Sequence, residues 1–132
     1  MSTEYGFSRK LGMPYELAVE KITAALKEEG FGVLTEIDVK ATLKTKLDVD
    51  FRRYVILGAC NPPLAHKALS SELEIGLMLP CNVIVYDSED GGSVVSAINP
   101  MAALGVVDNA ALQSVAEQVT EKMLRAVDSL VA

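Results

Sequence analysis

Both cysteines and the only histidine of this 132-residue chain, Cys60, His66 and Cys81, occur within less than a quarter of its length. Thiolate and imidazole groups are the ligands that zinc and other soft metals prefer, and two thiols can also form a redox couple. Three ligands are one short of a closed structural zinc site, and their spacing matches no compact metal motif. The two cysteines are therefore interpreted in three ways: as a redox couple, as part of a soft-metal site, or as two neighbours in the core.

Cys60 is expected to lie at the N-terminal end of a helix. Asn61 is a good N-cap residue, and Pro62 and Pro63 suit the first turn. Amides at a helix N-terminus stabilise a thiolate, so Cys60 is the position at which a reactive thiol can arise. The alternative is that Cys60 acts as a small apolar residue that fills tight space in the core.

The distance between Cys60 and Cys81 depends on the direction of two predicted strands. Residues 53–59 form a near-continuous apolar strand, expected at the centre of a sheet, and residues 82–87 form a strand rich in β-branched side chains. Parallel neighbours would place the cysteines at opposite edges, about 20 Å apart, whereas antiparallel neighbours would place them at one edge. An α+β fold favours the antiparallel case, which would gather Cys60, Asn61 and Cys81 around one binding site.

The rest of the pattern predicts short helices and strands in one domain, residues 1–132. Strands are predicted at 5–10, 31–37 and 93–98, and helices at 15–30, 61–75 and 109–130. Residues 38–47 fit both a strand and a helix, and Asp38 as an N-cap favours the helix. The glycine-rich residues 88–92 form the turn of a hairpin. The apolar residues 101–107 have three possible interpretations: they cover a pocket, they pack against a second subunit, or they line the core.

These elements indicate an α+β fold. We expect a two-layer sandwich in which a mostly antiparallel sheet of about five strands carries helices on one face. The helix that begins after Asn109 should pack across this sheet, because its apolar residues fall on one side: Leu112, Val115, Ala116, Val119, Met123, Ala126, Val127 and Leu130.

Composition excludes several classes of protein. The formal net charge is −6, which argues against nucleic acid as the main partner, because phosphate binding needs a concentrated basic face. Residues 1–10 lack the pattern of a signal peptide, and no run of about 18 apolar residues predicts a membrane span. We therefore expect a cytoplasmic protein with no membrane partner and with two free thiols.

Several motifs together resemble a known family. The segments Leu57–Ala65 and Gly76–Tyr86, followed by Gly92, and the segment Glu36–Lys40 are similar to the domain of unknown function 302 family of bacteria and archaea. The resemblance covers nearly the whole chain. It implies a compact α+β fold, similar to the TATA-binding-protein-like two-layer arrangement, and a homodimer. It supplies no activity, and the acidic charge argues against carrying DNA binding over from the fold.

No complete catalytic set is visible, since the chain has no phosphate-binding loop, no serine elbow and no metalloprotease His–Glu pair. Whether it catalyses a reaction, and with which cofactor, stays open. We expect a homodimeric module that binds a small molecule near Cys60, Asn61 and Cys81. The alternative is a thiol-dependent redox or soft-metal-handling protein that uses Cys60, Cys81 and His66.

Overall fold

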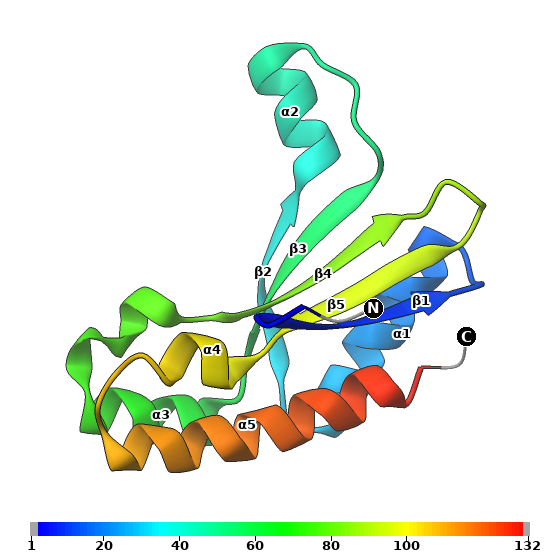
Figure 1. Ribbon diagram of the computed structural model, residues 1–132. Helices are drawn as coiled ribbons and strands as arrows, with labels where there is room; N and C mark the ends of the chain where they lie inside the picture. The colour runs from blue at the N-terminus through cyan, green and yellow to red at the C-terminus, as the bar shows by residue number, and fades with distance from the viewer. Residues whose placement is uncertain (1–2, 131–132) are drawn as a thin grey trace.

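A computed structural model describes residues 3–130 as a five-stranded sheet with helices, which confirms the predicted α+β class. The elements follow one another as β1 (Gly6–Leu11), α1 (Tyr15–Glu28), β2 (Gly32–Asp38), α2 (Val39–Leu47), β3 (Tyr54–Cys60), α3 (Pro62–Ser71), the 3-10 helix η1 (Leu73–Met78), β4 (Cys81–Asp87), β5 (Ser93–Ile98), α4 (Pro100–Leu104) and α5 (Ala110–Asp128). Figure 1 shows their arrangement.

The sheet has the order β1-β5-β4-β3-β2, and every neighbouring pair is antiparallel. The four strands from β2 to β5 therefore form a meander, and β1 joins it beside β5 (Figure 1). The residue 53–59 strand was expected at the centre. It is β3, an interior strand, and β4 next to it occupies the middle of the sheet.

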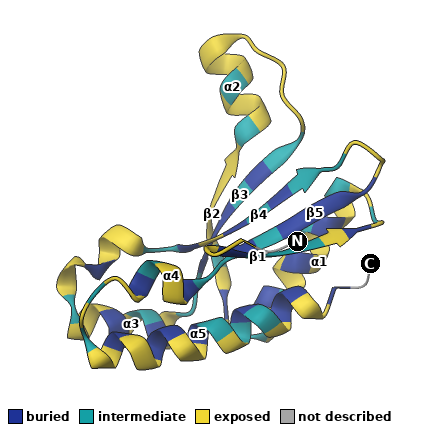
Figure 2. Ribbon diagram, viewed as in Figure 1, coloured by how far each residue is buried: buried dark blue, intermediate teal, exposed yellow. Residues whose placement is uncertain are grey.

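The helices α1 and α5 cover one face of this sheet, as predicted (Figures 1 and 2). The strands bury one row of apolar side chains beneath them: Val55, Leu57, Val83, Val85, Val95 and Ala97. All eight apolar residues predicted for the final helix are buried as well. On the opposite face Ile56 and Ile84 are only half-buried, because no helix covers them. Among residues 3–130, no helix has both the length and the apolar character needed to cross a bilayer.

The ambiguous residues 38–47 form a helix, which confirms the preferred interpretation. The Asp38 carboxylate caps α2 by accepting a hydrogen bond from the Ala41 amide at 2.9 Å. None of the residues of α2 is buried, and the helix projects away from the sheet beyond the end of β2 (Figures 1 and 2). Only Val39 and Leu43 of α2 are half-buried, so packing within the described chain gives this short helix little stability.

Helix α3 is shorter than predicted. The pattern indicated a helix up to about Ile75, whereas α3 ends at Ser71 and the chain turns at Glu72, where the backbone is extended. The six residues of η1 follow, and Ile75 within them is buried. The break lets Ile75 enter the core and carries the next residues over the end of the sheet.

Strand β2 contains an irregularity that the sequence did not predict. Its pairing with β3 shifts between Val33 and Thr35, so that Leu34 is an extra residue in the ladder. Such a bulge interrupts the alternation of faces that a regular strand would have over the predicted residues 31–37. Leu34 and Thr35 consequently lie near the same end of β3.

Next to this bulge, Gly58 of β3 allows two neighbours to approach closely. A Cβ atom at position 58 would lie 2.8 Å from the Cγ atom of Pro80, and it would overlap the hydroxyl of Thr35. Real Cβ atoms do not approach a proline ring so closely, so any side chain here must displace the segment that leads into β4.

Gly58→Ala is therefore expected to lower the free energy of unfolding by about 1–3 kcal/mol, because the added methyl group overpacks a closed site. Gly32→Ala on β2 is the matched control, since a Cβ atom there meets nothing within 4 Å. The control is expected to be neutral or to stabilise by up to about 1 kcal/mol. Urea unfolding followed by circular dichroism measures both, and equal effects of the two substitutions would contradict the close approach.

Candidate functional site

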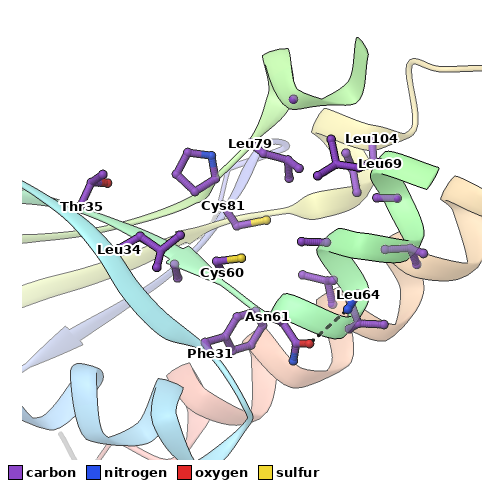
Figure 3. A pocket seen from close by; sticks show the side chains of 17 residues that line it. Phe31, Leu34, Thr35, Cys60, Asn61, Leu64, Leu69, Leu79, Cys81 and Leu104 are labelled. Atoms are coloured by element: carbon purple, nitrogen blue, oxygen red, sulfur yellow. Dashed lines mark hydrogen bonds between the residues drawn. The ribbon is translucent and has the colours of Figure 1, made fainter. Parts of the chain in front are cut away.

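A cavity of about 340 Å³ lies where the ends of β2, β3 and β4 meet α3, η1 and α5. Figure 3 shows its lining side chains. They are almost all apolar and belong to Phe31, Leu34, Thr35, Ala59, Cys60, Asn61, Leu64, Ala65, Ala68, Leu69, Gly76, Leu79, Pro80, Cys81, Leu104, Val115 and Val119. The cavity is open to solvent on one side, where Leu34 has 68% of its surface exposed.

The antiparallel pairing of β3 and β4 brings the two cysteines to this cavity. Ala59 lies directly opposite Cys81 in the ladder, so Cys60 is the next residue at the same end. Both thiols are free, and both sulfur atoms point into the cavity (Figure 3). The prediction that the cysteines share one edge of the sheet is therefore confirmed.

The environments of the two thiols differ. Cys81 has only 8% of its surface exposed, whereas Cys60 is half-buried. Burial disfavours a thiolate, and this effect, together with a smaller contribution from neighbouring Cys60, raises the pKa of Cys81 from its ordinary 9.0 to about 11. Cys81 is consequently protonated at neutral pH and is a poor nucleophile there.

Asn61 lies on the cavity wall, but both polar atoms of its amide group are already engaged in hydrogen bonds within the protein. Its Oδ1 atom accepts a hydrogen bond from the Leu64 amide, which caps α3 as predicted, and its Nδ2 atom donates to the Glu29 carbonyl at the end of α1. The Ala65 amide donates to the Asn61 carbonyl. Since Pro62 and Pro63 have no amide hydrogen, the amides expected to stabilise a Cys60 thiolate are missing or already used.

His66 is not part of the cavity. It is exposed on α3, beside a shallow depression whose other walls include Lys67, Ser114 and Gln118. Across residues 3–130, no three His, Cys, Asp or Glu side chains gather in a way that could hold a metal ion. The three predicted ligands Cys60, His66 and Cys81 are therefore not brought together, because the helical turn of α3 directs His66 to solvent.

The cavity walls include residues that the sequence analysis did not single out. Leu34 and Thr35 both reach it because of the bulge in β2, and Gly76 and Leu79 reach it because α3 breaks at Ser71. Leu104 belongs to the apolar segment 101–107, for which covering a pocket was one of three interpretations. The α3 side of the cavity could have been found from the sequence, because the run of small and apolar residues in this helix indicates an apolar wall.

This geometry suits an apolar ligand rather than a charged one. Of the residues that the structure describes, no Lys, Arg, His, Asp or Glu side chain lines the cavity, so a charged group inside it would lack a counter-ion. The polar groups on the wall are the Thr35 hydroxyl, the two thiols and the engaged amide of Asn61. Apolar walls with a few polar groups are typical of small-molecule sites of this volume.

The fold and the cavity define a two-layer α+β protein with an apolar site at one end of an antiparallel sheet. The chain belongs to the family described as domain of unknown function DUF302, whose sequence profile matches residues 7–130. Its structure is similar to that of the uncharacterized conserved protein DUF302 from Bacillus stearothermophilus, with 29% sequence identity and a TM-score of 0.86. The similarity covers 96% of this chain and 98% of that one. None of the curated proteins matches the chain.

Brief alkylation of the native protein near pH 8 is expected to label Cys60 well before Cys81. The reason is burial, since the pKa of Cys81 is about 11 and its thiolate forms only as the pH approaches that value. Site-resolved mass spectrometry measures the two rates. In urea the desolvation is removed, so the two rates should become similar; labelling of Cys81 first in the native protein would contradict the burial argument.

Proposed function

We propose that the protein is a homodimeric module that binds a small apolar molecule in the cavity beside Cys60 and Cys81. The observation that carries this proposal is the cavity itself, whose volume of about 340 Å³ is bounded almost wholly by apolar side chains. A cavity of this size falls within the range of small-molecule sites. No complete catalytic set accompanies it, so binding rather than catalysis is the proposed activity.

Binding would be driven by the transfer of apolar ligand surface out of water, at roughly 25 cal/mol for each Å² buried. A ligand with a compact aliphatic or aromatic body fits these walls best. The Thr35 hydroxyl stands at the exposed side and can donate to or accept from one polar group of the ligand. The buried end near Cys81 offers only a weak thiol donor.

The homodimer is supported by the amount of apolar surface that the single chain leaves uncovered. Most of the large exposed apolar side chains lie in two regions, on β2 with the following helix and loop and on η1 with the end of α3. Exposed apolar area of this kind marks surfaces that bind another protein. A net charge of only −6 offers little repulsion against self-association.

Ala65→Phe is expected to weaken binding of the uncharged fluorescent probe N-phenylnaphthylamine at least about tenfold, a loss of about 1.4 kcal/mol. Ala65 is half-buried on the cavity wall, so a phenyl ring at this position occupies the space that a ligand would fill. A fluorescence titration measures the affinity, and thermal melting checks that the variant is folded.

The matched control is Ala24→Phe, which adds the same ring at an exposed position of α1 outside the cavity. This control should bind the probe as the wild type does. If Ala65→Phe bound the probe as tightly as Ala24→Phe, the probe would be bound elsewhere, and the cavity would not be the ligand site.

A second candidate function is a two-thiol redox couple, supported by the two sulfur atoms that point into one cavity (Figure 3). In this reaction Cys60 and Cys81 would lose two protons and two electrons to form a disulfide, and hydrogen peroxide as oxidant would be reduced to two molecules of water. A disulfide would also narrow the cavity. His66 has no part in this candidate, because it lies outside the cavity.

Intact mass spectrometry after mild peroxide treatment tests the redox candidate. A disulfide removes two hydrogen atoms from the mass, whereas independent oxidation of Cys60 adds oxygen. The Cys81→Ser variant is the control, since it lacks the second thiol and should gain oxygen. Gain of oxygen by the wild type, with no loss of hydrogen, would contradict a redox couple.

A further inference from the structure

A projecting segment of the chain carries exposed apolar side chains. This segment, residues 37–51, comprises the end of β2, the whole of α2 and the following loop, and we call it the arm. Its large exposed apolar side chains are Ile37, Leu47, Val49 and Phe51. Because α2 buries none of its own residues, the apolar side chains of the arm stay exposed within residues 3–130 (Figure 2).

A second uncovered apolar surface borders the cavity. It consists of Leu69 of α3 and of Leu73, Leu77 and Met78 of η1, and we call these four residues the rim. Leu69 also lines the cavity, and so does Gly76 between the rim residues. The rim therefore borders the proposed ligand site, and Figure 3 shows Leu69 on the cavity wall.

Strand β2 connects the two surfaces. It is an edge strand with β3 as its partner, and its other edge is free within residues 3–130. The arm continues from one end of β2, at Asp38. At the other end Gly32 lies opposite Cys60, next to the cavity. The arm and the cavity with its rim thus lie at opposite ends of one unpaired strand edge.

A two-fold axis perpendicular to the sheet would pair β2 with the β2 of a second copy in the antiparallel direction. Asp38 of each copy would then lie near Gly32 of the other, and each arm would point past the Gly32 end of its partner. The nine residues of α2 extend about 14 Å, enough to reach across the cavity opening. The symmetry would bring the arm of each copy to the rim of the other. The dimer would then contain two identical arm–rim contacts, and each contact would bury one arm and one rim.

The charges of helix α2 and the rim are complementary. Helix α2 carries three lysines, Lys40, Lys44 and Lys46, and no carboxylate. The loop after it supplies Asp48 and Asp50, which both pair with Lys44, so Lys40 and Lys46 are the lysines left to meet a partner. Glu72 and Glu74 are interleaved with the rim leucines. Opposite charges at the border of an interface favour the correct pairing and reject others. The rim therefore offers α2 an apolar contact together with carboxylates of opposite charge.

From these observations we infer that the arm and the free edge of β2 bind a second copy of this chain, and that the partner's arm closes the open side of the cavity. The inference rests on the proposed function, because it makes the ligand site complete only in the homodimer. Pairing also removes an exposed strand edge, which is a general liability in sheet proteins. A different protein as occupant would have to match the arm and the rim separately, whereas a second copy matches both through one symmetry axis.

The double variant Ile37→Glu, Leu47→Glu tests this inference. Both side chains are exposed in the single chain, so the substitutions should leave its fold intact, as circular dichroism can verify. Sedimentation velocity at micromolar concentration is expected to give a dimer for the wild type and a monomer for the variant. The variant is also expected to bind N-phenylnaphthylamine at least about tenfold more weakly, because its cavity stays open.

Two further substitutions test whether any effect is specific to the arm. Val106→Glu is the matched control, since Val106 is as exposed as Leu47 (70% against 66%) but lies outside the arm and the rim, and it should remain dimeric. Ile84→Glu alters the uncovered face of the sheet. A wild-type monomer, or a dimer that Ile84→Glu dissociates and the arm variant does not, would overturn the interface. A monomeric arm variant with unchanged probe affinity would overturn closure of the cavity by the arm.

The same measurements separate this inference from the proposed function. A wild-type dimer that dissociates in the arm variant, but that never binds the probe, would support the interface and overturn the apolar ligand. Tight binding of the probe by a wild-type protein that stays monomeric would support the ligand site and overturn the interface.

Discussion

The antiparallel pairing of β3 with β4 is the constraint on which the rest of the site depends. It places Ala59 opposite Cys81, so the end of one strand and the beginning of the next form a single edge. Asn61 then directs the chain away from that edge into α3, and it also holds the end of α1 through the Glu29 carbonyl. These contacts hold α1 and α3 around the end of the sheet. The cavity beyond this end is therefore enclosed by several elements, and no single element fills it.

Asparagine caps determine how the helices surround this space. Asn109 caps α5 through the Ala111 amide, and its Nδ2 atom donates to the Ser71 carbonyl at the end of α3. Asn99 caps α4 in the same manner, through the Met101 amide. At each of these N-cap positions a short polar side chain accepts a hydrogen bond from a helix-end amide. Without this side chain the amide would be left without a partner near an apolar cavity. The walls are thus positioned by local hydrogen bonds, and the interior can remain apolar.

Features with a local cause could be predicted from the sequence. The cap at Asp38, the glycine-rich turn at residues 88–92 and the amphipathic pattern of α5 each depend on residues close in the chain, and the structure confirms them. The bulge at Leu34 and the end of α3 at Ser71 could not be predicted, because both serve contacts with distant residues. The cysteines, by contrast, were correctly placed at one edge of the sheet, because the fold class indicates the direction of the strands. The orientation of His66 depends on the helical phase of α3 relative to the cavity, which no local signal specifies.

The order of strands in the sheet also bears on how the chain acquires its structure. Strands β2 to β5 pair with sequence neighbours, whereas β1 must meet β5 from the far end of the chain, so Leu11 lies opposite Ser93. Loop-closure entropy favours formation of the meander first, with β1 added afterwards. During ribosomal synthesis β1 emerges before the other four strands of the sheet, and its partner β5 is the last of them to emerge. The charged residues Arg9 and Lys10 of β1 disfavour aggregation of this strand while it is still unpaired.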